Sequence, residues 1–261
     1  MDLSFDAETV SVETEGDAAR VVVDRPDRLN ALNVETLGAL SSALDAAEDA
    51  GARAVVVTGA GGEAFVAGAD IEHMREMDTP EALAYAEMGH DLCRQVEEFP
   101  APVVAAVNGY AFGGGCELAL ACDLRVASER ALLGQTEVDL GIVPGWGGTQ
   151  RLPRLVGDEL ARRMIFFGER VDASDAHEYG LVGEVVAHDD LAERADEMAT
   201  DLAAKPRHAL KAAKDALNAT HESDLASGLA YERRTFAGLF GTHDQREGMA
   251  AFAEDREPEF E

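Results

Sequence analysis

The chain has 261 residues, of which 46 % are hydrophobic, so it can bury a sizeable core and is not a disordered chain. Its formal net charge of −29 excludes a surface suited to nucleic acid or to an anionic membrane, because both carry charge of the same sign. There is no run of 18 apolar residues, and the segment Met1–Asp6 lacks a basic start followed by an apolar stretch. We therefore expect neither a membrane span nor a secretory signal.

The carboxylates are spread through the whole chain, and only three residues are lysine. An acidic soluble protein of any origin is one interpretation. The two features together favour a cytoplasmic protein from a salt-accumulating organism, where a Debye length of about 3 Å at 1 M salt screens self-repulsion. The cysteines Cys93, Cys116 and Cys122 have no metal-like spacing, and we interpret them as free, mostly buried thiols in a reducing cytoplasm.

The first half of the chain alternates between strand and helix patterns. Leucines at three- and four-residue spacing from Leu37 to Leu44 predict a helix. Thr79 and Pro80 are typical of an N-cap and a first-turn proline, and they predict a helix that ends near Glu98. Short apolar runs predict strands at residues 20–24, 53–58 and 102–107.

The second half begins with a glycine run at residues 113–115, then a short helix to Ala121 and a strand at 124–127. From about Leu191 the strand patterns stop and helical spacing takes over. We therefore predict an α/β core over residues 1–195 and a helical region over 196–261. One stripe of that region suits either subunit contact or internal packing, and it consists of Leu225, Leu229, Phe236 and Phe240.

Several common catalytic motifs are absent or incomplete. Residues 59–64 follow a strand and match the loose G-x-G-x-x-A dinucleotide pattern, but residues 65–70 read as extended chain and a turn where a helix is required. A plain glycine turn is the better interpretation. The seven histidines show no H-E-x-x-H spacing, and no G-x-S-x-G motif occurs. We expect no nicotinamide site, no metal and no serine nucleophile.

Two segments carry residues suited to acid–base chemistry. In residues 109–117 a strand breaks into three glycines and opens an apolar helix, so that backbone N–H groups at a helix N-terminus are available to stabilise an oxyanion. Glu117 lies in the first turn of this helix, where it also complements the helix dipole. Glu137 precedes an apolar stretch and a glycine–proline turn, and by itself it fits a helix cap or a surface carboxylate equally well.

The first of these segments and four others make the chain resemble the crotonase (enoyl-CoA hydratase) family. The resemblance covers nearly the whole chain and implies an α/β fold, a crotonase-type spiral of repeated ββα units with a C-terminal helical trimerisation region. It also implies a homotrimer or a dimer of trimers. The five motifs occur in order at the family's spacing, at residues 23–32 (VDRPDRLNAL), 64–71 (AFVAGADI), 113–117 (GGGCE), 144–152 (PGWGGTQRL) and 247–252 (EGMAAF).

The resemblance also implies the site residues. The thioester carbonyl is expected between the backbone N–H groups of Ala69 and Gly114, so a side chain at Gly114 should damage catalysis far more than folding. Glu117 is implied as the base on water and Glu137 as the acid side, and the two should titrate as a coupled pair. The acyl pocket is expected along residues 71–88, with Met74 and Met77. Substrate and CoA are expected to contact Arg28, Ala31, Ala67, Asp70, Ile71 and Trp146.

The family includes isomerases as well as hydratases, and the fold does not choose between them. Diene-shifting relatives carry aspartate at the positions of Glu117 and Gly145, and simple enoyl isomerases usually retain only the second carboxylate. The glutamate pair therefore favours addition of water to a trans-2-enoyl-CoA, in fatty-acid β-oxidation or related acyl-CoA metabolism. A non-catalytic acyl-CoA-binding protein would need one carboxylate to be missing.

Two expectations concern CoA itself. No separate cofactor is needed, because CoA is part of the substrate. The C-terminal residues 253–259 are acidic where relatives are commonly basic and touch the CoA phosphates, which leaves Arg256 as the candidate for that contact.

Overall fold

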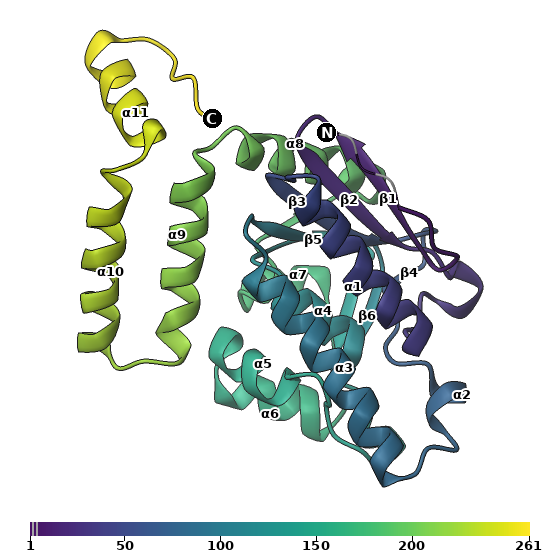
Figure 1. Ribbon diagram of the computed structural model, residues 1–261. Helices are drawn as coiled ribbons and strands as arrows, with labels where there is room; N and C mark the ends of the chain where they lie inside the picture. The colour runs from purple at the N-terminus through teal and green to yellow at the C-terminus, as the bar shows by residue number, and fades with distance from the viewer. Residues whose placement is uncertain (2, 4) are drawn as a thin grey trace.

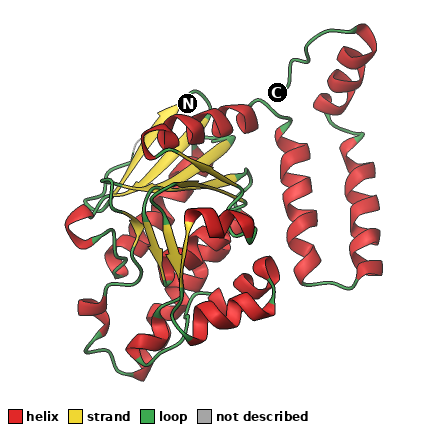
Figure 2. Ribbon diagram, turned by 180° about the vertical axis from the view of Figure 1, so that it is seen from behind, coloured by secondary structure: helices red, strands yellow, loops and turns green. Residues whose placement is uncertain are grey.

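The computed structural model describes residues 1, 3 and 5–261, so Asp2 and Ser4 of the N-terminal segment lie outside the described residues. Two sheets form the centre of the protein (Figure 2). The larger has the order β1-β2-β3-β5-β7-β10 and is parallel except between β1 and β2. The smaller has the order β4-β6-β8-β9 and is parallel except between β8 and β9. The strands are β1 (Val10–Glu15), β2 (Ala18–Val23), β3 (Ala54–Gly59), β4 (Ala64–Val66), β5 (Val103–Val107), β6 (Tyr110–Phe112), β7 (Leu124–Ser128), β8 (Leu132–Gly134), β9 (Arg170–Asp172) and β10 (Glu184–Val186).

From β3 to β8, consecutive strands alternate between the two sheets. β3, β5 and β7 enter the larger sheet, while β4, β6 and β8, which follow each of them, enter the smaller one. Helices α3, α4 and α5 follow the three pairs in turn, which confirms the spiral of ββα units. The strands predicted at residues 53–58 and 102–107 are β3 and β5. They read as continuous apolar runs because a central parallel strand is covered on both faces.

Helices cover both faces of the larger sheet (Figure 1). Val55 and Val57 of β3 face the main core with α1 and α3, whereas Ala54 and Val56 face α8. The helices are α1 (Val34–Asp49), α2 (Ile71–Met74), α3 (Thr79–Glu98), α4 (Gly114–Ala121), α5 (Gly148–Val156), α6 (Asp158–Phe166), α7 (Ala173–Glu178), α8 (Leu191–Ala203), α9 (Arg207–Asn218), α10 (Leu225–Leu239) and α11 (His243–Glu254), with 3-10 turns η1 (Pro26–Arg28), η2 (Glu137–Leu140), η3 (His188–Asp190) and η4 (Ala219–His221).

Helix α3 begins with a capping box. The Asp78 side chain accepts from the Glu81 N–H at 2.9 Å, and the Glu81 side chain accepts from the Asp78 N–H at 2.9 Å. The N-cap is therefore Asp78, and the prediction of Thr79 is wrong by one residue, because the reciprocal Asp–Glu pair satisfies two backbone donors at once. The predicted end at Glu98 is confirmed.

The C-terminal helices α9, α10 and α11 stand beside the body of the protein (Figure 1). The buried Lys214 of α9 anchors this region, since its ammonium donates to the carbonyls of Val96 and Ala101 and pairs with Asp123 at 2.8 Å. The apolar stripe of α10 is exposed, with Leu225 at 79 % and Phe236 at 64 %, so it is not packed inside this chain. Helix α8, which covers the sheet, spans the predicted division at residue 195.

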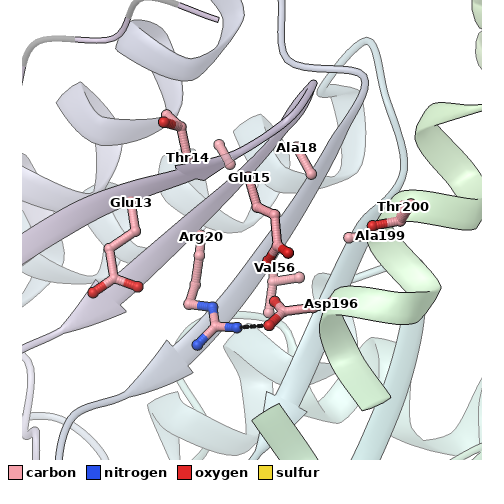
Figure 3. Close-up of a pocket in the computed structure, with 10 residues that line it drawn as sticks. Glu13, Thr14, Glu15, Ala18, Arg20, Val56, Asp196, Ala199 and Thr200 are labelled. Carbon is pink, nitrogen blue, oxygen red and sulfur yellow. Dashed lines mark ion pairs between the residues drawn. The ribbon is translucent and has the colours of Figure 1, made fainter. Parts of the chain in front are cut away.

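A cavity of about 130 Å³ lies between the β1–β2 hairpin and α8 (Figure 3). Arg20 of β2 forms an ion pair there with Asp196 of α8, and Glu13 and Glu15 line the same space. The cavity is on the α8 face of the larger sheet, whereas α4, which carries Glu117, packs into the core on the other face. It is therefore separate from the residues implied in catalysis. Within residues 1, 3 and 5–261, none of the helices combines the length and the apolar character needed to span a membrane.

Candidate active site

Glu117 is fixed at the start of α4. Strand β6 ends at Phe112, and Gly113 then takes a φ of 49°, a left-handed conformation that glycine adopts readily, before the helix begins. The Glu117 side chain is 1 % exposed, and its Oε1 accepts two hydrogen bonds of 2.7 Å, from the backbone N–H groups of Trp146 and Gly148. Oε2 takes part in neither of these two hydrogen bonds, so it is the oxygen more available for proton transfer.

Burial raises the pKa of Glu117. The N–H groups of Gly148, Trp146 and Gly145 and the charge of Arg151 oppose that rise without cancelling it. A buried carboxylate held by fixed donors keeps its orientation when it gains or loses a proton. Glu117 is therefore held in place to exchange a proton with a water molecule.

Glu137 is the first residue of the turn η2. It follows strand β8, whose last residue, Gly134, accepts a hydrogen bond from the Gly113 N–H. Glu137 is 9 % exposed, and a Cβ atom added to Gly113 would lie 3.2 Å from its Oε1. With the Gln135 amide oriented so that its nitrogen faces Glu137, that nitrogen donates to both carboxylate oxygens, at 2.9 and 3.2 Å. Burial, with a further contribution from the charge of Glu117, raises the pKa of Glu137 to about 7. The structure thus brings the two glutamates within electrostatic reach of each other.

The raised pKa of Glu137 has a consequence for stability. In the unfolded chain this carboxyl ionises at its ordinary pKa of 4.5, so the free energy of unfolding falls as pH rises from about 4.5 through about 7. Glu137→Gln removes the ionisation, and we expect the variant to gain on the order of 3 kcal/mol over the parent above pH 7. Urea unfolding of both proteins from pH 4.5 to 8 measures this gain. A difference that does not change with pH would contradict it.

Ala69 and Gly114 present their backbone N–H groups from two adjacent segments. Ala69 lies opposite Leu32 in a short parallel β-bridge. The two hydrogen bonds of this bridge are donated by the Leu32 N–H to the Gly68 carbonyl and by the Asp70 N–H to the Leu32 carbonyl, so the N–H of Ala69 points away from it. A Cβ atom added to Gly68 would lie 4.0 Å from the Gly114 nitrogen, which places the turn beside the start of α4. Within the described residues, neither N–H donates a hydrogen bond, as an oxyanion site requires.

The expectation that a side chain at Gly114 would spare folding is wrong. A Cβ atom there would lie 2.2 Å from the Trp146 ring, which packs directly on Gly114. We expect Gly114→Ala to lower the free energy of unfolding by about 2 kcal/mol or more, because the buried Trp146 ring is also packed against Gly89 and Tyr85. Gly145→Ala is the control, since a Cβ atom at Gly145 meets nothing within 4 Å. Denaturant melts measure both, and equal stability of the two variants would contradict the packing argument.

The segments expected to hold CoA form one rim. Arg25 joins them, because its guanidinium donates to the Ala31 carbonyl and pairs with Asp70 at 3.2 Å. Ala67 donates its N–H to Leu29 at 3.0 Å. Arg28 and Ile71 lie at the outer edge: the side chain of Arg28 is 58 % exposed and pairs with Glu72 at 3.3 Å, and Ile71 is 54 % exposed.

Four other residues expected to contact substrate or CoA lie outside this rim. The Trp146 ring is 4 % exposed and packs in the core, so this residue reaches the site through its backbone. Met74 and Met77 are half-buried against the core. The guanidinium of Arg256 is paired with Glu247 at 2.5 and 3.0 Å and with Glu254 at 2.8 Å.

Several residues that shape the site were not singled out from the sequence. Asn30 has a φ of 58° and is fully buried, and its side chain bonds Arg25, Ala60 and Ala64, which fixes the loop before Ala31. The hydroxyl of Tyr85 donates to the carbonyl of Leu32, and its ring lies 5.5 Å from that of Trp146. Asn30 lies within the motif at residues 23–32, and Gln135 lies two residues before Glu137. These positions are the sequence feature that could have pointed to them.

The three cysteines are free and buried, as predicted. Burial raises the pKa of Cys116, beside Glu117, to about 12, so this thiol stays neutral. Over residues 1, 3 and 5–261, no three His, Cys, Asp or Glu side chains are arranged to hold a metal ion.

The comparisons with known proteins agree with this geometry. The short-chain-enoyl-CoA hydratase of Clostridium acetobutylicum is 44 % identical over 251 residues, 96 % of each chain. The crotonyl-CoA hydratase of Syntrophomonas wolfei is 40 % identical over 97 % of this chain and 98 % of its own. The crystal structure of an enoyl-CoA hydratase from Bacillus anthracis superposes with a TM-score of 0.93 at 40 % identity, over 97 % of this chain and 99 % of that one. Residues 13–261 match the family described as enoyl-CoA hydratase/isomerase, and the chain belongs to that family.

Proposed function

We propose that this chain adds water to trans-2-enoyl-CoA thioesters to give 3-hydroxyacyl-CoA. The observation that carries the proposal is the pair of buried glutamates, Glu117 and Glu137, beside unoccupied backbone N–H donors. The hydratase names of relatives at 40 % identity or more over nearly the whole chain support the same reaction.

The reaction assigns a role to each group. Glu117 Oε2 takes a proton from water while the water oxygen bonds to the β-carbon, and the electron pair of the double bond moves onto the thioester oxygen. The N–H groups of Ala69 and Gly114 stabilise that enolate. Glu137, with a pKa of about 7, delivers a proton to the α-carbon as the enolate collapses. Proton exchange within the coupled pair restores the starting state.

An enoyl-CoA isomerase is the alternative from the same family, and the matched family description includes both reactions. Diene-shifting relatives carry an aspartate at position 145. This chain has Gly145 there, although a side chain would meet nothing within 4 Å, and the missing aspartate favours hydration over a diene shift. The test follows crotonyl-CoA and a 3-enoyl-CoA by absorbance and product analysis. Loss of the conjugated thioester with formation of 3-hydroxybutyryl-CoA supports hydration. Conversion of the 3-enoyl ester alone supports isomerisation, and binding without turnover supports an acyl-CoA-binding protein.

The CoA moiety is assigned to the rim built by Arg28, Ala31, Ala67, Asp70 and Ile71, and no separate cofactor takes part. The acyl chain is assigned to the side of Met74 and Met77, which are half-buried at the start of residues 71–88. Trp146 supports the site from behind through its backbone N–H.

The helical region 196–261 is assigned to assembly, as a homotrimer or a dimer of trimers. Two exposed apolar surfaces support this. One is the α10 stripe, with Leu225, Leu229, Phe236 and Phe240. The other is the turn after Glu137, where Leu140, Ile142 and Val143 are between 47 and 69 % exposed.

A cytoplasmic location in a salt-accumulating organism is the remaining part of the proposal. Its support is the charge of −29 with three lysines, of which Lys214 is buried and Lys211 is paired with Asp215 at 2.6 Å. The lysines therefore add little free positive charge to the surface.

A further inference from the structure

A bidentate ion pair lies directly behind the loop that holds Glu117. Arg151 of α5 donates from Nε and Nη2 to the two carboxylate oxygens of Glu97, at 2.6 and 2.7 Å. The side chains are 20 and 35 % exposed, so solvent screens this pair less than the exposed pairs of the surface. Glu97 lies in the last turn of α3, where its carbonyl accepts from Asn218 of α9 at 3.0 Å.

The third donor of the guanidinium points at the loop itself. Arg151 Nη1 donates to the carbonyl of Trp146 at 2.7 Å. It also lies against Gly147, where an added Cβ atom would be only 2.0 Å away. The residues on either side of Gly147, Trp146 and Gly148, donate the two hydrogen bonds to Glu117 Oε1. The guanidinium therefore holds the segment 146–148, whose first and last N–H groups bind the Glu117 carboxylate.

We propose that Glu97 and Arg151 are a positioning pair that orients the Glu117 carboxylate and sets the charge facing it. The inference rests on the proposed function, in which Glu117 is the base. Arg151 acts through the main chain of residues 146–148 and through its charge, while Glu97 fixes the guanidinium and offsets part of that charge.

The charged and titratable groups that face Glu117 determine the direction in which its pKa should shift in each variant. They are Glu137 of η2, Arg151 of α5, Cys93 of α3 and Cys116 of α4. Burial raises the pKa of both thiols, so they stay neutral and Arg151 is the positive charge in this set. Removing that charge raises the pKa of Glu117, and removing the negative charge of Glu97 lowers it. A base must be ionised to act, so the acid limb of the kcat–pH profile should move to higher pH when the pKa of Glu117 rises and to lower pH when it falls.

The experiment compares Arg151→Gln, Arg151→Lys and Glu97→Gln in crotonyl-CoA hydration at one fixed salt concentration. For Arg151→Gln we expect kcat to fall about ten- to a hundredfold with little change in KM, and the acid limb to move to higher pH. Arg151→Lys keeps the charge, so its limb stays near that of the parent. For Glu97→Gln the limb moves to lower pH. Arg162→Gln, which removes an exposed ion pair with Asp158 at 2.6 Å, is the matched control and should leave kcat and the limb unchanged.

A second readout does not need turnover. Trp146 is the only tryptophan, and its N–H binds Glu117, so a pH titration of its fluorescence that disappears in Glu117→Gln reports the ionisation of Glu117. Its midpoint should shift up in Arg151→Gln and down in Glu97→Gln. If the parent does not hydrate crotonyl-CoA but these shifts occur, the proposed function fails and the positioning pair stands. If the parent is active and neither limb nor midpoint moves, the pair is only structural and the inference is overturned.

Discussion

Glu117→Gln and Glu137→Gln should each lower the turnover of crotonyl-CoA by roughly 10² or more, while the affinity for a CoA ester changes little. In Glu117→Gln the amide oxygen still accepts from the N–H groups of Trp146 and Gly148, so the loop keeps its place and only the proton acceptor is lost. In Glu137→Gln the amide cannot release a proton at pH 7, although it fills the same space beside Gly113.

Steady-state kinetics and binding of a saturated acyl-CoA measure the two effects separately. Glu193→Gln, at an exposed position on α8, controls for the loss of one carboxylate from an acidic chain. Near-normal turnover in either catalytic variant would contradict the two-glutamate mechanism. If the Glu117 variant alone kept activity, and on a 3-enoyl substrate, the reaction would be isomerisation.

The same substitution at residue 137 should lower turnover and raise stability above pH 7. An ionised carboxylate at that position is unfavourable in the folded state because burial and the charge of Glu117 both oppose it. A catalytic group kept at a cost in stability is common where a site must hold perturbed ionisation states.

Molar KCl or NaCl should favour both assembly and activity, and the two should decline together below a few hundred millimolar. A charge of −29 on each subunit is multiplied in any oligomer, and the phosphates of CoA esters approach the same negative field. At 1 M salt the screening length is about 3 Å, which removes most of the repulsion between subunits and from the substrate.

Sedimentation and turnover across a salt series measure the two responses. Sucrose at matched osmolality is the control, because it is excluded from protein surfaces but does not screen charge. An oligomer and a rate that are unchanged in dilute buffer would show that the acidic surface is incidental. Added salt should slightly weaken ion pairs within the chain, such as Arg20–Asp196. Any gain in assembly at high salt must therefore come from screening of the carboxylates that have no cationic partner.

Much of the core was predictable from local patterns. The strands β3 and β5 are continuous apolar runs because both of their faces are covered, and the leucine spacing of α1 matches the helical period. Glu117 was placed correctly in the first turn of its helix, because three glycines before an apolar segment mark a helix start where the backbone can be approached closely. The N-cap of α3 was misplaced by one residue because Thr79 and Asp78 are both good caps, and the contact with Glu81 decides between them.

The sequence by itself determined which residue types were available to the site. It also located β2, β3, β5 and β7 and the helices α1, α3 and α4, because periodicity and turn chemistry are local properties. Only the tertiary structure decided that β6 and β8 lie side by side and bring Glu137 next to Gly113. It also decided that the N–H groups of Trp146 and Gly148 meet Glu117 and that Arg151 holds them. The two Glu117 contacts join residues 29 and 31 positions apart, and their geometry depends on packing, which no local pattern encodes.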